Sequence, residues 1–381
     1  MDFSLTDDQQ VFRAEIRRFA EQRLRPHYQT DDATGRMTPS IFDDMAAVGL
    51  FGLRVPERLG GAGADAVTVG IAAEEVARSN INAGYALLST ALVCDIFLAA
   101  ATEAQLSQWL PPIAEGRVIP TLALTEPGHG SDAANIELAA KPCVDGWEIS
   151  GEKTSISLTE DADHAVVFAR TGAAGARGVS AFYVPLTDPA VSRVRLDDIA
   201  NRAAGRCSLF FDQLPVTRDQ LVGAEGSGFV SVMQGFEYSR AIIGLLALGT
   251  AAAALDDAIE YAKQRSTFGA PISTRQGVAF PLVEHLTYVA GARHLCYEAL
   301  WRKDQGLDHT EHASMVKWWA PKAAVEAIHQ ALLTFGHAAW SAENPQAQRL
   351  RDAMGFEIAD GTAQIAKLVV ARSVFGRQYA P

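Results

Sequence analysis

The chain has 381 residues, of which 48% are hydrophobic and 20% charged, and its 33 basic and 45 acidic side chains give a net charge of −12. This composition is typical of a globular protein of two or three packed units and excludes a largely disordered chain. The negative charge argues against nucleic-acid binding. The four cysteines are widely spaced and form no C-x-x-C pair, so we expect no disulfide framework, no metal site and a reducing, cytoplasmic location.

Residues 1 to about 117 are expected to form helices. Thr6 has the character of a helix cap, and Val11 and Ile16 follow it at helical spacing. Acidic residues precede the first apolar block, so no secretory signal is expected. A glycine-rich loop at 59–65 separates this first helical hairpin from the helices that follow.

Two more helices are expected in this region. Residues 71–77 are amphipathic, and Glu74 and Glu75 are expected on the polar face. Residues 83–101 are apolar over nearly the length of a membrane span, but Asp95 lies in the middle of them. We interpret this stretch as a helix buried in a helical domain. Because an unpaired buried carboxylate is costly, Asp95 should have either a partner or a function.

The pattern changes after this helical region. Short segments such as HAVVFAR and VSAFYVPL are rich in β-branched and aromatic residues, and Gly, Asp and Pro separate them, which is typical of strands. Helical periodicity then returns in segments long enough for a bundle. We therefore predict an α+β fold with an N-terminal α-helical domain at 1–117, a middle antiparallel β domain at 118–222 and a C-terminal four-helix bundle at 223–381.

The sequence contains no G-x-G-x-x-G, no P-loop and no G-x-S-x-G motif. Two other segments suit a nucleotide cofactor. LALTEPGHGSD, which begins at Leu122, places small residues, backbone N–H groups and hydroxyls after a strand, although a plain turn explains it equally well. In RSTFGAPISTRQ, Arg265 offers a fixed charge for a pyrophosphate and Phe268 a cover for a ring; the alternative is a helix end followed by a turn.

Two further segments carry charged groups near apolar helices. In ADGTAQIAKLVVAR, Asp360 lies on a loop before a helix, where a carboxylate can act as a general base. The simpler alternative is that Asp360 or Thr362 is the N-cap of that helix. In FEYSRAIIG, Glu237 and Arg240 enter an apolar helix, where an arginine needs a partner; a surface ion pair is the alternative.

Taken together and in this order, these segments resemble the acyl-CoA dehydrogenase family. The resemblance extends over essentially the whole chain and includes FSLTDDQQ, VPERLGGAG, TEPGHGSD, LVGAEGSGF, RSTFG and the final DGT-QI. It implies the three-domain fold predicted above, non-covalent FAD, an acyl-CoA thioester substrate and α,β-dehydrogenation. It also implies a homotetramer in which a neighbouring subunit completes each FAD site, an electron-transferring flavoprotein as acceptor, and no insertion into a membrane.

The resemblance also implies which residues contact FAD. From the middle domain, these are Leu122, Leu124 and Thr125 at the isoalloxazine, Gly130 and Ser131 at the phosphates or the CoA, and Ser155 and Ser157 near flavin N5, where Ser157 replaces the usual Thr. From the C-terminal domain, they are Arg265, Phe268 and Gln276 toward the FAD of the adjacent subunit, Gly336 near the cofactor edge, and Thr362 and Gln364 at the diphosphate and ribose.

Asp360 corresponds to the catalytic base of the family, which is usually a Glu in a Tyr-Glu-Gly-Thr segment. Some members instead place the base just before the arginine equivalent to Arg240, where this chain has Ser239. The resemblance implies that Arg240 orients the base and moderates its pKa, and that the backbone N–H of Asp360 donates to the thioester carbonyl. The expected substrate contacts are Ser131, Glu237, Arg240 and Asp95.

Several departures from the family pattern bear on the substrate. Asp360 is one methylene shorter than Glu, and Ser155 replaces a bulky aromatic residue beside the flavin. The shorter acid requires either that the backbone advances or that the substrate is bulkier near Cα, and Ser155 leaves room for a wider substrate. Our leading hypothesis is therefore the conversion of cyclohexane-1-carboxyl-CoA to cyclohex-1-ene-1-carboxyl-CoA. The alternative is 1,4-dehydrogenation of a cyclohexenecarboxyl-CoA with Asp95 taking part. Leu333 and His337 also depart from the Gln-x-x-Gly-Gly pattern of the family, which predicts altered FAD contacts.

Two readings compete with an acyl-CoA dehydrogenase. Nitroalkane oxidases resemble this family, also use Asp as base and need no CoA. A non-catalytic flavin-binding or acyl-CoA-binding module would retain its ligands without any reduction of the flavin. These alternatives differ in which compound, if any, bleaches the flavin.

Overall fold

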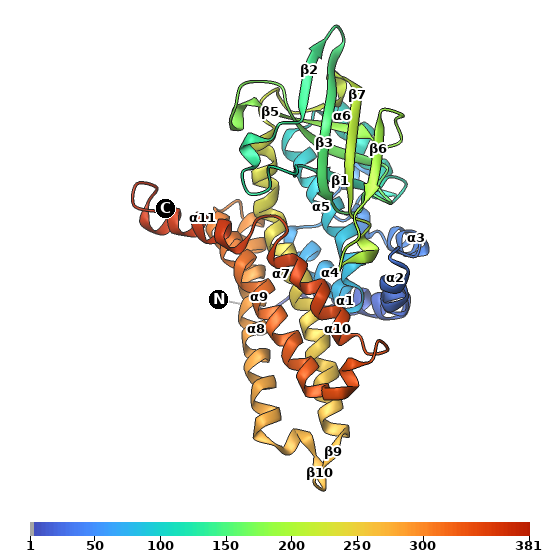
Figure 1. Ribbon diagram of the computed structural model, residues 1–381, viewed down its shortest axis with the longest axis vertical. Helices are drawn as coiled ribbons and strands as arrows, with labels where there is room; N and C mark the ends of the chain where they lie inside the picture. The colour runs from blue at the N-terminus through green and yellow to red at the C-terminus, as the bar shows by residue number, and fades with distance from the viewer. Residues whose placement is uncertain (1–3) are drawn as a thin grey trace.

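The computed structural model describes residues 4–381, so Phe3 of the FSLTDDQQ motif lies outside the described residues. In chain order, a helical N-terminal region is followed by a β domain and then by a helical C-terminal bundle, which confirms the predicted α+β fold (Figure 1). The β domain lies at one end of the molecule and the long helices of the bundle extend away from it (Figure 1). The N-terminal helices are α1 (Asp7–Phe19), α2 (Tyr28–Thr34), α3 (Ser40–Ala47), α4 (Ala66–Ser79), α5 (Ile81–Ala100) and α6 (Glu103–Ala114).

Local sequence fixes where these helices begin. Thr6 and Gln9 form a capping box at α1, and Thr102 and Gln105 form a second one at α6. Asn80 ends α4 and also caps α5, its side chain accepting from the first backbone N–H groups of α5. The caps satisfy backbone donors that would otherwise be left without partners at each helix start.

The β domain is one twisted sheet of eight strands. Its order is β6-β7-β3-β2-β4-β5-β8, with β1 pairing to β4. Most neighbours are antiparallel, as predicted, but β1 runs parallel to β4, as does the single β2 pairing with β4. The strands are β1 (Pro120–Ala123), β2 (Ala139–Cys143), β3 (Gly146–Ile156), β4 (His164–Arg170), β5 (Val179–Pro185), β6 (Val191–Arg195), β7 (Cys207–Thr217) and β8 (Leu221–Val222).

Three long helices build the C-terminal bundle. The longest, α7, has 37 residues and so runs about 55 Å from the β domain to a small hairpin at the opposite end of the molecule (Figure 1). The elements are α7 (Gly228–Gln264), the hairpin strands β9 (Ser266–Thr267) and β10 (Ala270–Pro271), α8 (Gln276–Asp304), α9 (Thr310–Phe335), α10 (Gln346–Met354) and α11 (Ala363–Phe375).

Two helices, α5 and α7, are long and apolar enough to cross a membrane by length and composition alone. Other parts of the chain bury 78% and 83% of their most apolar windows, as they bury the central helices of a core. One apolar cluster joins α4 and α5 to α7, α8 and α9, and another joins α5 and α6 to the sheet. These shared clusters fix the β domain relative to the bundle, and the candidate site lies where they meet.

The polar face predicted for Glu74 and Glu75 does not face solvent. Both are fully buried, because α4 is covered by α1 on one side and by the bundle on the other. Glu75 binds Arg13 and Arg17 at 2.6 and 2.7 Å, and Glu74 binds Arg293 at 2.5 Å. The polar stripe of α4 is therefore an internal ion-pair layer between two helical layers.

Candidate active site

Asp360 lies on the turn that joins the bundle to the last helix. The backbone N–H of Ala359 donates to the carbonyl of Gly355 at 3.0 Å and closes a turn that begins at a short 3-10 segment, Gly355–Glu357. Asp360 itself has a φ of +51°, a conformation that disfavours most side chains and that tends to persist at functional sites. Thr362, and not Asp360, is the N-cap of α11, so the Asp360 carboxylate is not committed to capping.

A buried hydroxyl contacts this carboxylate. Ser239 on α7 is fully buried, and its Oγ donates to Oδ2 of Asp360 at 3.2 Å. Ser239 is the position at which some members of the resembled family place their base. In this chain the position instead supplies a hydrogen bond to Asp360, which favours the ionised carboxylate.

Sequence reasoning missed Lys317, which lies on α9. This lysine is only 1% exposed, and its Nζ donates to the carbonyl of Phe356 at 2.9 Å. Burial raises the pKa of Asp360, and Lys317, Ser239 and Arg240 oppose that rise, with the lysine contributing most of the three. The signal for Lys317 was a lone cation between Val316 and two tryptophans in an apolar helix, but its partner is 39 residues away in the sequence.

Arg240 acts on Asp360 through its charge. It is 6% exposed, and its Nη1 hydrogen bond goes to Ser314 Oγ at 3.4 Å. Within residues 4–381 its Nε has no hydrogen-bond partner. Burial lowers the pKa of Arg240, against the attraction of Asp360 and Glu237. The site thus holds two buried cations, Arg240 and Lys317, around one carboxylate.

The loop that follows β1 is fixed by a buried ion pair that sequence reasoning also missed. Lys153 is fully buried and donates to the Leu124 carbonyl and to Glu126 Oε1, both at 2.8 Å. Glu126 in turn accepts from the backbone N–H groups of Glu137 and Leu138. Burial lowers the pKa of Lys153 to about 8, while Glu126 acts to raise it. This pair sets the shape of the segment in which Leu122, Leu124 and Thr125 lie.

Thr125 and Ser157 are held on neighbouring strand ends. The backbone N–H of Thr154 donates to the Thr125 carbonyl at 2.9 Å, and Thr121 Oγ1 donates to the Ser157 carbonyl at 2.7 Å. Both Thr125 and Ser157 are half-buried, as is the apolar side chain of Leu122. Beyond them, Gly130 and Ser131 are exposed, and a Cβ at Gly130 would meet no atom within 4 Å.

These residues fit the expected cofactor. An apolar side chain and two hydroxyl-bearing residues at one strand edge suit a flat ring system with polar atoms at its rim. The open loop with backbone N–H groups suits phosphates. Leu122, Thr125, Ser157 and the loop at 127–132 would therefore hold FAD from the middle domain.

The small side chain of Ser155 does not simply leave empty the space that a bulky aromatic residue would fill at this position. It has a φ of +61°, and its Oγ accepts a hydrogen bond from Arg206 Nη1 at 3.2 Å. The Arg206 guanidinium is also ion-paired with Asp198, its Nε lying 2.8 Å from Oδ2. Part of the volume that an aromatic residue at 155 would take is thus occupied by a paired guanidinium.

A second group of predicted cofactor residues lies at the far end of the bundle. Arg265 lies 26 residues after Ser239, directly beyond the end of α7, so the two residues are about 39 Å apart along the helix axis. The β9–β10 hairpin, which contains Phe268, lies at the tip of the bundle (Figure 1). Phe268 is 98% exposed with a φ of +51°. Gly336 is at the same end, because the preceding Phe335 stacks on Tyr261 near the end of α7. One chain therefore does not bring Arg265, Phe268, Gln276 and Gly336 to Asp360.

Two other predicted residues, Glu237 and Asp95, are bound to other side chains of the protein. Thr310 Oγ1 donates to Glu237 at 2.9 Å, which ties the start of α9 to α7. Asp95 binds Arg54 at 2.8 Å and Lys303 at 3.0 Å. Asp95, which was expected to need a partner because it is buried, therefore has two cationic partners. Of the remaining predicted residues, Thr362 is half-buried and Gln364 exposed at the start of α11.

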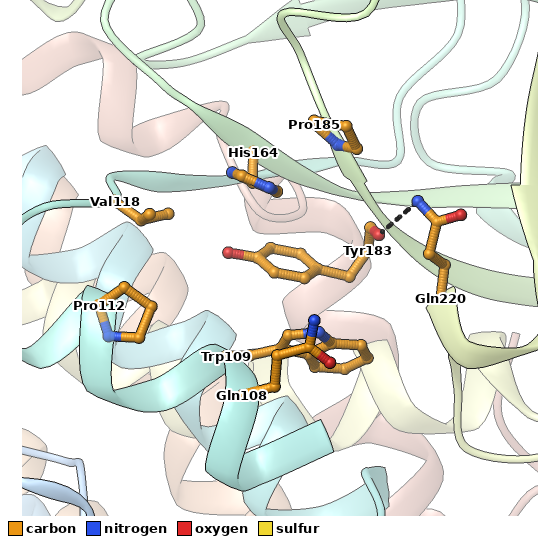
Figure 2. A pocket seen from close by; sticks show the side chains of 8 residues that line it. All are labelled: Gln108, Trp109, Pro112, Val118, His164, Tyr183, Pro185 and Gln220. Atoms are coloured by element: carbon orange, nitrogen blue, oxygen red, sulfur yellow. Dashed lines mark hydrogen bonds between the residues drawn. The ribbon is translucent and has the colours of Figure 1, made fainter. Parts of the chain in front are cut away.

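A separate cavity of about 210 Å³ lies between α6 and the sheet (Figure 2). The Tyr183 ring stacks on His164 with centroids 4.9 Å apart and packs against Trp109 at 5.0 Å, while Gln220 donates to the Tyr183 carbonyl. None of the residues that the sequence predicted for the site lines this cavity.

Comparisons with known proteins agree with the resemblance noted in the sequence. The family models match for the acyl-CoA dehydrogenase N-terminal domain at 6–117, the middle domain at 121–214 and the C-terminal domain at 226–375. The mitochondrial short-chain specific acyl-CoA dehydrogenase of Bos taurus is 36% identical over 370 residues, covering 96% of this chain and 90% of that protein.

Solved structures give the same result. Butyryl-CoA dehydrogenase from Megasphaera elsdenii superposes with a TM-score of 0.95 at 31% identity, covering 98% of this chain and 100% of that one. A chain from the structure of the electron-transferring flavoprotein of Acidaminococcus fermentans superposes with a TM-score of 0.96 at 32% identity, covering 98% of this chain and 99% of that one.

Proposed function

Because this chain belongs to the acyl-CoA dehydrogenase family, and is therefore an FAD-dependent oxidoreductase acting on the CH–CH bond of an acyl-CoA, we propose that Asp360 is its catalytic base. The observation that carries this proposal is the placement of the Asp360 carboxylate between α7, α9 and α11, where a buried hydroxyl and two buried cations surround it. No other carboxylate among the predicted site residues has these surroundings: Asp95 is bound to two cations, and Glu237 is bound to Thr310.

The chemistry of each residue follows from these contacts. Asp360 accepts the proton from the thioester Cα, and FAD supplies the hydride acceptor for Cβ. Burial raises the basicity of Asp360, which brings its pKa closer to that of a weak carbon acid, while Lys317 and Arg240 oppose this rise and favour the ionised carboxylate. The backbone N–H of Asp360 is the proposed donor to the thioester carbonyl, on which charge grows as the proton leaves.

The acyl group is proposed to be compact near Cα. An Asp at position 360 reaches about one bond length less far than a Glu, so Cα has to approach the turn more closely. A ring at Cα, as in cyclohexane-1-carboxyl-CoA, remains the finer proposal on the strength of Asp360 and Ser155. The Arg206–Ser155 contact limits the extra width, and the named relatives act on short-chain and butyryl thioesters, which favours a short acyl chain as the competing substrate.

We do not assign Asp95 a role in 1,4-dehydrogenation. Both of its carboxylate oxygens already bind cations, Oδ1 to Arg54 and Oδ2 to Lys303. The Tyr238 ring also holds these cations in place, because Arg54 and Lys303 lie over it at 5.5 and 5.0 Å from its centroid. A carboxylate held in this way is a structural link between α5, α7 and α8.

Anaerobic bleaching of the flavin tests the function directly. The purified protein is mixed with butyryl-, octanoyl-, isobutyryl-, cyclohexanecarboxyl- and cyclohexenecarboxyl-CoA, with nitroethane as a control. Fast bleaching by a short or cyclic thioester is expected. Bleaching by nitroethane alone would mean a nitroalkane oxidase, and no bleaching by any compound would favour a non-catalytic binding module. Preference for octanoyl-CoA would refute the compact acyl group while leaving the family intact.

The proposed assembly is a homotetramer. Support comes from the distance of about 39 Å between Ser239 and Arg265, which leaves the hairpin to serve the site of another subunit. Support also comes from apolar side chains left at the surface of one chain, including Phe268, Phe280, Val283 and Trp340. An electron-transferring flavoprotein is the proposed acceptor, in keeping with the named structural relative.

A further inference from the structure

Lys317 is a buried cation with unusual surroundings. It is 1% exposed on α9, and its Nζ donates at 2.9 Å to the Phe356 carbonyl, which belongs to the 3-10 segment just before Asp360. An ammonium has three protons and cannot be left unpaired in the core without a large cost. Such a group is retained at a buried position only where its charge meets a compensating charge.

The charged groups that face Lys317 come from three elements. Asp360 lies on the turn before α11, Glu357 on the 3-10 segment, and Arg240 on α7. Asp360 and Glu357 favour the charged lysine, and Arg240 opposes it. Asp360 is in turn contacted by Ser239 from α7 and faced by Arg240.

Lys317 is linked to Asp360 through contacts with the intervening backbone as well as through charge. Phe356 is anchored on one side by Lys317 and on the other by its ring, which stacks on Tyr85 with centroids 5.0 Å apart. The Ala359 N–H bonds back to Gly355, so the segment from 355 to 360 moves as one turn. Fixing the Phe356 carbonyl therefore fixes where the Asp360 carboxylate starts.

We propose that Lys317 is a positioning residue for Asp360: it anchors the 355–360 turn through the Phe356 carbonyl, and its positive charge favours the ionised Asp360 carboxylate. This inference rests on the proposed role of Asp360 as base. Burial lowers the pKa of Lys317 to about 8, so the lysine is still largely charged at neutral pH and can exert this effect.

The first test is the pH dependence of flavin reduction in single turnover, with butyryl-CoA and cyclohexanecarboxyl-CoA as probes. Lys317→Met should shift the acidic limb of the profile upward by about one pH unit, because one opposing charge is lost. At pH values well above that limb the rate should stay below that of the parent, because the hydrogen bond that anchors the turn is lost as well. Lys317→Arg should retain the parent limb, and Lys322→Met, which removes an exposed lysine from the same helix, should leave the profile unchanged.

A profile of Lys317→Met that superposes on the parent overturns the proposal. So does a uniform loss of rate at every pH with an unshifted limb, in a variant that keeps its fold and its FAD, because an anchor without any effect of the charge on Asp360 predicts that result. If no thioester of the panel given under Proposed function bleaches the flavin of the parent, the proposed function fails, and the second test below decides the inference about Lys317 by itself.

The second test does not depend on flavin reduction. It uses a variant of Lys317 only to assign the NMR signal of this side chain. The chain has seven lysines, so the side-chain signals of lysine-labelled FAD-loaded protein can be followed through a pH titration by NMR. The Lys317 signal is the one absent from Lys317→Arg. Because coupling is reciprocal, Asp360→Asn should lower the titration midpoint of Lys317 by about one pH unit. An unchanged midpoint would mean that the two groups do not interact, which overturns the proposal.

Discussion

Ser239 Oγ donates a hydrogen bond to Asp360 Oδ2 at 3.2 Å, across a sequence separation of 121 residues. The hydroxyl can also reach the Phe236 carbonyl in its own helix, at 3.5 Å, so it has an alternative partner when the carboxylate is protonated. The bond therefore favours the ionised form of Asp360, and it links the central helix of the bundle to the turn that carries the proposed base.

Ser239→Ala should make Asp360 harder to ionise. A hydrogen bond to a charged group contributes about 1.5–3 kcal/mol, and one pKa unit is about 1.4 kcal/mol, so the acidic limb of flavin reduction should shift upward by about one pH unit. Stopped-flow absorbance at a series of pH values measures the limb. Thr250→Ala serves as the control, because Thr250 is a buried hydroxyl on the same helix that bonds only backbone carbonyls. An unshifted limb in Ser239→Ala would show that the bond does not act on the base.

Asp360→Asn should abolish most of the reduction while leaving the flavin bound. Removal of a general base typically costs about 10²–10⁴ in rate. Asparagine tolerates positive φ, so the turn at +51° should survive the change. The yellow colour and the anaerobic bleaching rate are measured on the same sample. A variant that bleaches at the parent rate would exclude Asp360 as the base.

The sequence predicts the layout of the fold because its long periodic patterns are local. Burial of a helix can be inferred from its own residues when these are apolar, as in the stretch at 83–101 and in the periodic segment after 223. Both segments form central helices of the structure. The same local reasoning placed Glu74 and Glu75 on a polar face, but a polar stripe on one helix does not reveal that arginines from α1 and α8 cover it.

The sequence supplied candidate residues for the site but not their contacts. Asp360 and Arg240 were found through motifs, whereas Lys317 carries no motif and meets the Asp360 turn only through folding. Asp95 was correctly expected to need a partner or a function, but its partners Arg54 and Lys303 lie 41 and 208 residues away. Partners at such separations follow from packing and not from spacing along the chain.

Phe268→Ala should weaken FAD binding and the assembly. The side chain is 98% exposed in one chain, so its loss should leave the fold of the chain intact. If Phe268 is buried against a neighbouring subunit and its cofactor, removal of the ring should weaken FAD binding about tenfold to a hundredfold. Val144→Ala is the matched control, because Val144 is also 98% exposed but lies on the turn between β2 and β3. Light scattering gives the mass and titration of the apoprotein gives the FAD affinity. Equal values for the parent and Phe268→Ala would argue against a role at a subunit interface.

Glu75→Gln should destabilise the helical core. Glu75 is fully buried between Arg13 and Arg17, and breaking a buried ion pair from one side costs about 3 kcal/mol or more. The arginines lower the pKa of Glu75, so its contribution is present above pH 4.5 and is lost as the pH falls through its folded value. The urea midpoint of the parent should therefore drop on acidification more than that of Glu75→Gln. Glu103→Gln removes an exposed partner of Arg58 and should change the free energy of unfolding by less than about 0.5 kcal/mol.

Asp360→Glu tests why this chain has the shorter acid. The added methylene extends the carboxylate by about one bond length, so a wide group at Cα should collide with it while a straight chain is still reached. We expect the ratio of the bleaching rate with cyclohexanecarboxyl-CoA to that with butyryl-CoA to fall by about tenfold, a change in barrier of about 1.4 kcal/mol. Both rates are measured anaerobically at a pH well above the acidic limb, so that the ionisation of the acid does not enter. Arg206→Ala, which leaves Asp360 untouched but removes the guanidinium beside Ser155, should move the ratio the opposite way. If Asp360→Glu lowers both rates equally, the length of the acid does not select the acyl group, and the preference for a compact substrate must come from the walls of the site instead.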